Sequence, residues 1–480
     1  MTTMSLFRKI FHLSHRFSPT LVNLIHGFYV TVNGSRFDEV KRYIDSSLSK
    51  PIYASSGDSL SRSIANILGE VDHNPREVRY AFVSNFPPED TGIATCSFYS
   101  WLGQGDPIDI FCPVRDIDWF VRNREILAKN YGSGVRLLDI GTFLSADCIH
   151  KYEKIILATG NSDHCLFVHE IIKKANISGG TNRCVLYVHD PCLLNLIQKG
   201  AELSGAELLG VLEKIYRRPL KGALSGSARD WEIHAYLISQ GVFGTRWFYN
   251  QGIRHFLVNS EAASKLLHDD LAGTGVKIQT VFHPAFLPLG AQPYSVEAAS
   301  KIVPGINRPL IIGSFGIPSD SKKTIDIIQA AIKLRDRPLN VKLILAGYQV
   351  KSFVKKYAED LKNIECEFFD GPTELQLVDC MRQVDVAVQL RSQNLGESSG
   401  IVPQLLMLRK PTIVSAVGSF VEFGDAVISI KSDASVSILA DAILQASLTP
   451  PQEERMEAYV AARTPAKFRQ ELFRLLDEME

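Results

Sequence analysis

The spacing of hydrophobic residues divides this chain of 480 residues into stretches with different patterns. From Arg79 onward, short apolar runs alternate with longer segments in which apolar residues recur every three or four positions. Short apolar runs between polar turns are typical of buried strands, and the longer spacing is typical of amphipathic helices. In the first half of the chain the runs predict strands at 79–83, 108–112, 154–158, 184–188 and 256–259. Strands that alternate with helices indicate a parallel sheet.

A second series of the same kind begins at Pro309. It predicts strands at 310–314, 341–346, 385–389, 412–415 and 427–430, and helices at about 323–335, 353–362, 374–382, 399–409 and 435–446. Between the two series, residues 284–308 hold four prolines and two glycines, which indicates a linker.

We therefore expect an α/β protein with two Rossmann-like, doubly wound domains, at 76–300 and 301–450, joined by this linker and separated by a central cleft. Such a cleft is the usual place for a ligand. The C-terminal segment, 451–480, predicts a charged amphipathic helix that crosses back to the first domain.

Residues 1–75 follow another pattern and predict an N-terminal helical extension. Basic residues surround one apolar helical face, formed by Leu6, Phe7, Ile10, Phe11 and Phe17 and flanked by Arg8, Lys9, His15 and Arg16. A face of this kind docks on a protein or lies on an anionic membrane surface, and for residues 5–32 both remain open. The chain has no run of about 18 apolar residues, so the sequence predicts no membrane-spanning helix.

Composition narrows the class of protein. Lys plus Arg and Asp plus Glu both number 52, so no overall basic field would attract nucleic acid, and we expect no nucleic-acid partner. The eight cysteines lack the Cys-x-x-Cys spacing of zinc sites. We expect them to be reduced, buried thiols of a cytoplasmic protein, peripheral at the inner face of the cell membrane if residues 5–32 contact lipid.

The residues that could bind a ligand or take part in catalysis stand mainly where predicted strands end, most clearly in residues 390–415. There a strand end leads into a Gly-Glu-Ser-Ser-Gly turn, a short apolar helix, then Lys-Pro and a β-branched strand. This order brings a helix N-terminus, small residues and a carboxylate to the carboxyl edge of a parallel sheet, where α/β proteins bind phosphorylated ligands. The candidate residues are Arg391, Glu397, Ser398, Ser399, Gly400 and Gln404.

Three strand ends of the first domain carry further candidates. Gly92 opens a helix, and its missing side chain permits a ligand to approach the backbone. Asn161 and His164 follow the strand 154–158, where an Asn or Ser that caps a helix is the alternative interpretation. His189 and Asp190 end the strand 184–188, and a carboxylate next to a histidine orients it or favours its charged form.

The first strand of the second domain ends in another glycine turn. Gly313 and Gly316 permit the loop to pass close to a diphosphate, and a lysine after the loop, Lys322 or Lys323, would neutralise that ligand. The sequence does not tell which of the two lysines points inward. A solvated lysine pair at a helix start is the alternative.

As an ordered set, these motifs resemble the retaining glycosyltransferases of the GT-B fold, in family 4 (glycosyltransferase group 1) and of the bacterial surface-polysaccharide type. The resemblance covers roughly residues 78–450. It implies a nucleotide-sugar donor and a glycan or lipid-linked saccharide acceptor. It also implies catalytic roles for His189, Asp190 and Glu397, and donor contacts by Gly92, Asn161, His164, Gly313, Gly316, Lys322, Lys323, Arg391, Ser398, Ser399, Gly400 and Gln404.

The chain departs from the family at Gln404, where the usual glutamate holds the nucleotide ribose. No acidic pair at a strand end would hold Mg²⁺, and Asp269 and Asp270 are expected on a solvated helix face. We expect metal-independent hexosyl transfer, with no cofactor besides the nucleotide-sugar substrate. The absence of a carboxylate pair suited to glycoside hydrolysis also favours transfer.

Two alternatives remain. One is a GT-B homologue without catalysis that serves as a partner-binding or regulatory subunit, which Gln404 and the lack of a cation in the first glycine turn motivate. The other is a different GT-B enzyme, such as a nucleotide-sugar epimerase or a phosphorylase.

Overall fold

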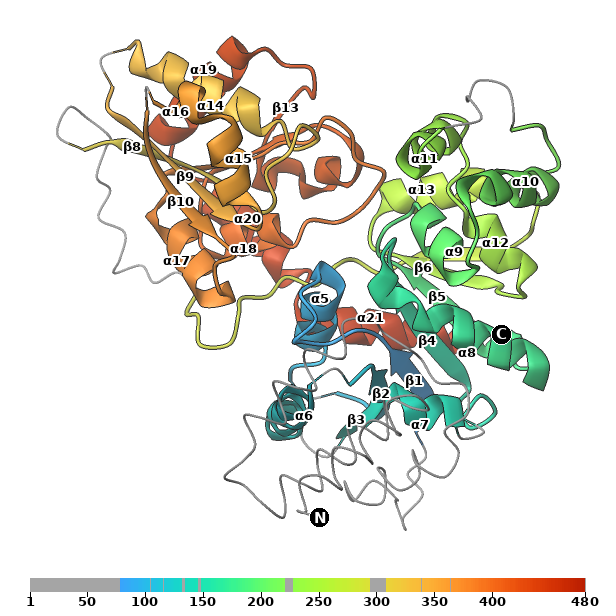
Figure 1. Cartoon of the computed structure of the whole chain (residues 1–480). Helices are drawn as coiled ribbons and strands as arrows, with labels where there is room; N and C mark the ends of the chain where they lie inside the picture. The colour runs from blue at the N-terminus through green and yellow to red at the C-terminus, as the bar shows by residue number, and fades with distance from the viewer. Residues whose placement is uncertain are drawn as a thin grey trace, which may run out of the picture. The chain divides into compact units, whose positions relative to one another are not determined.

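The structure, a computed structural model, describes residues 78–479 except 104, 115, 132–133, 146–147, 221–227, 294–307, 338 and 363 (Figure 1). Within these residues the chain forms two compact units. The first unit holds residues 78–257 and 269–278, and the second holds 258–268 and 279–478. The predicted helical extension 1–75, with the face at 5–32, lies outside the described residues, as does most of the predicted linker.

The first unit is built on a sheet in the order β3-β2-β1-β4-β5-β6-β7. Its strands are β1 (Tyr80–Val83), β2 (Ile108–Cys112), β3 (Val135–Asp139), β4 (Lys154–Thr159), β5 (Cys184–Val188), β6 (His255–Val258) and β7 (Lys277–Thr280). Parallel pairing joins β1 to β2 and β4, β2 to β3, and β4 to β5. All five strands predicted for this domain are confirmed, each within one residue at either end.

Helices cover both faces of this sheet. Side chains alternate between the two faces along each strand. Phe82 of β1 packs on Trp101, just after α5, with ring centroids 5.1 Å apart. Phe111 of β2 is in register with Val83 and so faces the other way, where it packs on Phe143 of α7 at 4.9 Å. A parallel sheet buried on both faces is the doubly wound arrangement that the pattern predicted.

The helices that follow these strands are α5 (Gly92–Ser100), α6 (Ile117–Tyr131), α7 (Ile140–Ser145), α8 (Phe167–Ser178), α9 (Leu194–Gly200), α10 (Gly205–Tyr216), α11 (Asp230–Ser239), α12 (Thr245–Asn250) and α13 (Glu261–Asp270). Short 3₁₀ turns, η3 (Asp163–Cys165) and η4 (Thr181–Arg183), precede α8 and β5.

The second unit has a parallel sheet in the order β10-β9-β8-β11-β12-β13. Its strands are β8 (Leu310–Phe315), β9 (Val341–Gly347), β10 (Glu365–Asp370), β11 (Val386–Gln389), β12 (Thr412–Ser415) and β13 (Ile428–Ile430). The helical segments are α14 (Thr324–Arg335), α15 (Val350–Lys356), α16 (Ala358–Leu361), α17 (Glu374–Gln383), α18 (Ile401–Met407), η6 (Gly418–Ala426), α19 (Val436–Leu448), α20 (Glu453–Ala461) and α21 (Pro465–Asp477).

This second sheet is also covered on both faces. Ile328 of α14 and Leu439 of α19 share one buried cluster with Leu343 of β9. The next residue of β9, Ile344, faces the opposite side and shares a second cluster with Leu405 of α18. The C-terminal helix α21 is amphipathic as predicted, and its crossing to the first domain stays a prediction.

The eight cysteines are free thiols, all buried except Cys366, which is partly exposed. Burial raises the pKa of Cys96 to about 12 and that of Cys165 to about 11, so these thiols stay protonated near neutral pH. In the part of the chain that the structure describes, no helix is long and apolar enough to cross a membrane.

The expectation of a solvated Asp270 is wrong. Asp270 is 2% exposed. Its carboxylate accepts hydrogen bonds from the Tyr216 O–H at 2.7 Å, the Thr245 N–H at 3.0 Å and the Phe243 N–H at 3.2 Å. It therefore joins the end of α13 to α10 and to the start of α12, and only Asp269 is on the exposed face.

Candidate functional site

Carboxyl ends of neighbouring parallel strands meet at the same edge of a sheet. Most predicted site residues lie in turns at two such edges, one in each unit. The first edge comprises the turns after β1, β4 and β5 (residues 85–92, 160–164 and 189–190). The second edge comprises the turns after β8 and β11 (residues 316–323 and 390–400).

At the first edge, a side chain caps the first turn of α5, and the Cβ position of Gly92 has no close neighbour among the described residues. The Thr91 side chain accepts a hydrogen bond from the Ala94 N–H at 3.1 Å, which stabilises the helix start. A Cβ atom on Gly92 would have no neighbour within 4 Å. The described part of the protein therefore gives no packing reason for a glycine at 92, and it leaves room for a ligand beside the backbone.

Asp190 lies over the turn after β4. Its Oδ2 accepts a hydrogen bond from the Asn161 N–H at 2.9 Å. A Cβ on Gly160 would lie 2.5 Å from this oxygen and 2.5 Å from Cδ1 of Ile93, so glycine is needed there. Burial raises the pKa of the Asp190 carboxyl, and the hydrogen bond from Asn161 opposes that rise.

The Asn161 side chain caps a helix, although not the one that follows it in the sequence. Its Oδ1 accepts hydrogen bonds from the Asn195 N–H at 2.8 Å and the Leu196 N–H at 3.2 Å, in the first turn of α9. Asn161 therefore joins Asp190 to α9. Asn161 therefore positions other residues at the first edge. Its predicted contact with the donor stays a prediction.

His164 connects the turn after β4 to the turn after β1. Its Nδ1 lies 2.5 Å from Oε2 of Glu89, whose side chain is only 9% exposed. His189, at the end of β5, is 8% exposed, and its ring centroid lies 4.4 Å from that of Tyr187. The structure thus brings the predicted residues of the first domain to one edge, where they contact one another or their own scaffold.

At the second edge, a lysine lies directly over the glycine turn. Gly316 has a φ of +96°, and a Cβ on it would lie 2.8 Å from Nζ of Lys322. Both the backbone angle and the ammonium group therefore favour glycine. Burial, together with the neighbouring charge of Arg391, lowers the pKa of Lys322 to about 8.

Lys323 bonds other groups of its own unit. It begins α14 in the left-handed conformation, with a φ of +51°. Its Nζ lies 2.8 Å from a carboxylate oxygen of Asp326 and donates to the carbonyl of Ser432 at 2.9 Å. Of the two lysines, Lys322 is therefore the one at the glycine turn, and the donor contact predicted for each of them stays a prediction.

Arg391 is the second cation of this edge. Its N–H donates to Oγ of Ser415 at 2.9 Å, and its guanidinium donates to the Leu390 carbonyl at 2.8 Å and lies 5.1 Å from the ring centroid of Phe420. Burial lowers the pKa of Arg391, and the charge of Glu397 opposes this shift. Among the described residues, no carboxylate forms an ion pair with Lys322 or Arg391.

Two contacts that the sequence did not reveal hold these turns together. The Ser392 N–H donates to the Ser321 carbonyl at 2.8 Å, which ties the Arg391 loop to the Lys322 loop. With its amide oriented to satisfy both atoms, Gln389 at the end of β11 bonds the Phe315 carbonyl at 3.1 Å and the Phe315 N–H at 2.8 Å. The two cations therefore lie on a fixed scaffold.

Two side chains of the predicted Gly-Glu-Ser-Ser-Gly turn form hydrogen bonds to nearby backbone groups. Oε2 of Glu397 accepts a hydrogen bond from the Leu395 N–H at 2.8 Å. The Ser398 hydroxyl donates to the Asn259 carbonyl at 3.3 Å. These contacts shape the turn, and the predicted catalytic role of Glu397 stays a prediction.

The end of the turn is more open. Oγ of Ser399 accepts from the Val402 N–H at 3.2 Å and so caps α18. A Cβ on Gly400 would meet nothing within 4 Å. Gln404 is 8% exposed, and its side-chain amide makes no hydrogen bond to another described residue. The Gln404 amide does not belong to the fully buried side-chain groups that lack a partner, and its predicted contact with a ribose hydroxyl stays a prediction.

Gly313 differs from the other predicted glycines, because it lies inside β8 rather than in the turn. A Cβ on it would lie 2.5 Å from Cγ1 of Val384 and 2.7 Å from the ring of Phe315. Close packing in the sheet therefore explains this glycine.

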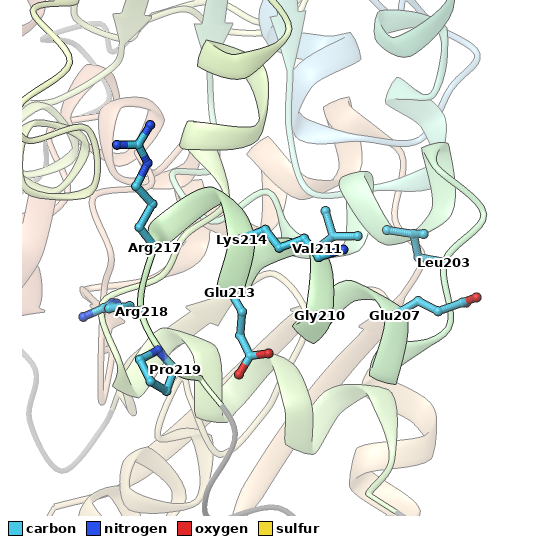
Figure 2. Close-up of a pocket in the computed structure, with 9 residues that line it drawn as sticks. All are labelled: Leu203, Glu207, Gly210, Val211, Glu213, Lys214, Arg217, Arg218 and Pro219. Carbon is cyan, nitrogen blue, oxygen red and sulfur yellow. The ribbon is translucent and has the colours of Figure 1, made fainter.

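No group of three or more His, Cys, Asp or Glu side chains that could hold a metal ion occurs among the described residues. A surface depression of about 860 Å³ lies along α10, where Lys214 and Arg217 are among its lining residues (Figure 2). Glu213 also lines it, and its carboxylate accepts a hydrogen bond from the Leu220 N–H at 2.9 Å. The depression contains none of the predicted site residues, and we assign it no role.

No protein-family model matches the chain, and no curated protein sequence matches it. Solved structures do. HepE of Anabaena in complex with UDP-glucose has a TM-score of 0.51 and 14% identity, over 83% of this chain and 99% of HepE. The structure of HepE with UDP and glucose gives the same values. The UDP-forming α,α-trehalose-phosphate synthase of Burkholderia xenovorans, with glucose-6-phosphate, has a TM-score of 0.48 and 12% identity, over 83% of this chain and all of the synthase.

At 14% identity the likeness shows the fold alone. Both units have the parallel, doubly wound sheets of the GT-B fold. The predicted fold class is thereby confirmed for the residues that the structure describes.

Proposed function

We propose that this protein is a glycosyltransferase that moves a sugar from a nucleotide-sugar donor to a glycan or lipid-linked saccharide acceptor. The observation that carries the proposal is the pair Lys322 and Arg391 at the second edge. Both cations are partly buried, each lies in a loop held by backbone contacts, and neither forms an ion pair with a described carboxylate. A diphosphate is the ligand that fits such a pair.

Burial of a cation without an anion is unfavourable, which is why the pKa of Lys322 falls to about 8. A pyrophosphate would restore the charged form through charge-assisted hydrogen bonds, and Arg391 suits its oxygens in particular. Gly316 supports this assignment because its lack of a side chain makes room for Nζ of Lys322 directly against the backbone of the turn.

The same groups suit the chemistry of transfer. A nucleotide sugar already carries a good leaving group, so the protein must hold the donor and stabilise the negative charge that develops on the diphosphate. In our proposal Lys322 and Arg391 do this without a metal ion. His189 and Asp190 of the first edge and Glu397 of the second act at the reacting sugar, and Gln404 binds a ribose hydroxyl.

Further features belong to the proposal and rest on the resemblance of the motifs. We propose that transfer retains the anomeric configuration and that the transferred sugar is a hexose. We also place the reaction in bacterial surface-polysaccharide synthesis, in the cytoplasm, with residues 5–32 as a peripheral contact to the membrane or to a protein. The binding of UDP-glucose by HepE, which shares the fold, makes UDP-glucose the first donor to test.

A thermal-shift screen with UDP-, GDP-, ADP- and dTDP-sugars tests the proposal, since a ligand that binds the native state raises the melting temperature. We expect a shift with one nucleotide class, lost in Lys322→Ala and kept in Lys323→Ala. Acceptor-dependent release of the nucleoside diphosphate in the presence of a metal chelator then tests transfer. A screen without any shift, or equal losses in both lysine variants, would contradict the proposal, and specific binding without turnover would favour the non-catalytic homologue.

A further inference from the structure

The loop between β11 and α18, residues 390–400, has no helix or strand of its own. It nevertheless carries Arg391 at its start and Glu397 to Gly400 at its end. Side-chain contacts must therefore fix its shape, because the backbone of an irregular loop does not satisfy itself. Most of these contacts are made by the side chain of Asn394.

The Asn394 amide bonds three backbone groups on two segments. Its Oδ1 accepts hydrogen bonds from the Gly396 N–H at 2.8 Å and from the Ser419 N–H at 3.0 Å, at the start of η6. Its Nδ2 donates to the Glu397 carbonyl at 3.0 Å. The Ser419 hydroxyl donates to the same carbonyl at 2.7 Å. One side chain thus joins the loop to η6 and closes the turn before Glu397.

The surrounding backbone is shaped to this side chain. Gly418 has a φ of +54°, and a Cβ on it would lie 2.1 Å from Oδ1 of Asn394. Gly396 has a φ of +108°, and a Cβ on it would lie 2.4 Å from the backbone nitrogen of Ala263. Glycine is therefore required at 396 and at 418, the two positions that pack around this part of the loop.

We propose that Asn394 is a positioning residue for the donor diphosphate, an inference that rests on the proposed function. It does not touch the ligand. It holds the loop so that Arg391 at one end and the backbone of Ser398 to Gly400 at the other reach the same ligand. The asparagine followed by glycine two residues later, which is typical of an Asx-turn, is the signal that identifies it in the sequence.

The experiment compares Asn394→Ala with Lys410→Met. Lys410 lies just before β12, at the opposite edge of the sheet, where its Nζ donates to the carbonyls of Arg382 and Val384. Its loss destabilises the same unit without touching the loop. Titration calorimetry with UDP and with inorganic pyrophosphate gives the affinity of each folded variant, and ligand-free melting temperatures report the stability.

We expect Asn394→Ala to weaken binding of both probes by about tenfold, while Lys410→Met changes the affinity by less than about twofold at a similar loss of stability. Gly418→Ala, which displaces Oδ1 of Asn394, should weaken binding to a similar extent, and the double variant should lose less than the sum of the two effects. This non-additivity would not arise from two unrelated losses of stability.

The outcomes separate the inference from the proposed function. If the wild-type protein binds neither probe, the proposed function and this inference are both overturned. If the wild-type protein binds and Asn394→Ala or Gly418→Ala binds equally well, the positioning role alone is overturned. If Asn394→Ala does not fold, the affinity of Gly418→Ala tests the positioning role: weaker binding supports it, and unchanged binding overturns it.

Discussion

The two edges that carry the predicted site residues differ in how their polar groups are partnered. At the first edge, Asn161 joins Asp190 to α9, and His164 pairs with Glu89. At the second edge, Lys322 and Arg391 are partly buried in bonded loops, and neither forms an ion pair with a described carboxylate, although the charge of Glu397 acts on Arg391. The named groups of the first edge thus bond one another, although Oδ1 of the buried Asn85 at the same edge has no hydrogen-bond partner among the described residues. The second edge has two cations that form no ion pair with a described carboxylate.

This difference indicates where the tightest ligand contacts form. Groups that already have partners contribute shape and orientation, and they gain little from a ligand. A buried cation without an anion gains the most, because binding removes an existing cost. We therefore assign affinity for the donor to the second edge, and we assign the arrangement of the reacting groups to the first. The variants below test this division, beginning with the largest expected effect.

The first test removes the Lys322 ammonium group. Lys322→Ala should weaken binding of UDP-glucose by about 10- to 100-fold, since a hydrogen bond to a charged group contributes about 1.5–3 kcal/mol. Lys323→Ala is the matched control, because that lysine is occupied by Asp326 and Ser432. Titration calorimetry measures both. Equal affinities in the two variants would remove the distinction between the lysines.

The second test compares two glycines of the first edge. Gly160→Ala should lower the free energy of unfolding by about 1–2 kcal/mol, because the new Cβ meets Asp190 and Ile93. Gly92→Ala should change it by less than about 1 kcal/mol, because that position is open. Urea unfolding measures the stability and a transfer assay the activity. We expect Gly92→Ala to impair transfer at unchanged stability, and a large loss of stability there would contradict the open position.

The third test uses pH. The pKa of Lys322 is about 8 in the ligand-free protein, and only the protonated form attracts a diphosphate. The affinity for UDP should therefore fall as pH rises above 8, by up to about tenfold per pH unit. Lys322→Arg, which stays charged, should show a flat profile between pH 7 and about 9.5. A parallel decline in both proteins would place the titrating group elsewhere.

The smallest expected effect concerns the internal contacts of the first edge. Asn161→Ala removes the acceptor for two N–H groups of α9 and should cost about 1 kcal/mol of unfolding free energy, as for other helix caps. Asn176→Ala serves as a control, because the Asn176 amide makes a long contact of 3.5 Å to Gln251 at the surface. It should change stability by less than about 0.5 kcal/mol. If urea unfolding shows equal losses, Asn161 does not support α9.

The sequence predicted the buried strands of both sheets well and missed three strands at their edges. These are β3, β7 and β10, each of which is the outermost strand on one side of its sheet. A central strand of a parallel sheet is buried on both faces and reads as a continuous apolar run. An edge strand carries polar and charged residues, as β10 does with Glu365, Glu367 and Asp370, so its run is broken.

For the candidate site, the sequence identified the turns but not the partners within them. It could not distinguish Lys322 from Lys323, because contacts to Asp326 and to the distant Ser432 decide their roles. It placed Asp270 on a solvated face, because Tyr216, which hydrogen-bonds to it, lies 54 positions away in the sequence. Local pattern shows which residue types stand at a strand end, and tertiary contacts determine which of them remain available for a ligand.

The central claim is that Lys322 binds the diphosphate of the donor, and proton uptake tests it most directly. At pH 8.5 the phosphates of UDP are already ionised, whereas most Lys322 side chains are neutral at a pKa of about 8. Calorimetric titration of UDP in two buffers of different ionisation enthalpy should show uptake of a fraction of a proton per site. Lys322→Arg should bind UDP without proton uptake. Binding by the wild-type protein without uptake, or the same uptake in Lys322→Arg, would contradict the account.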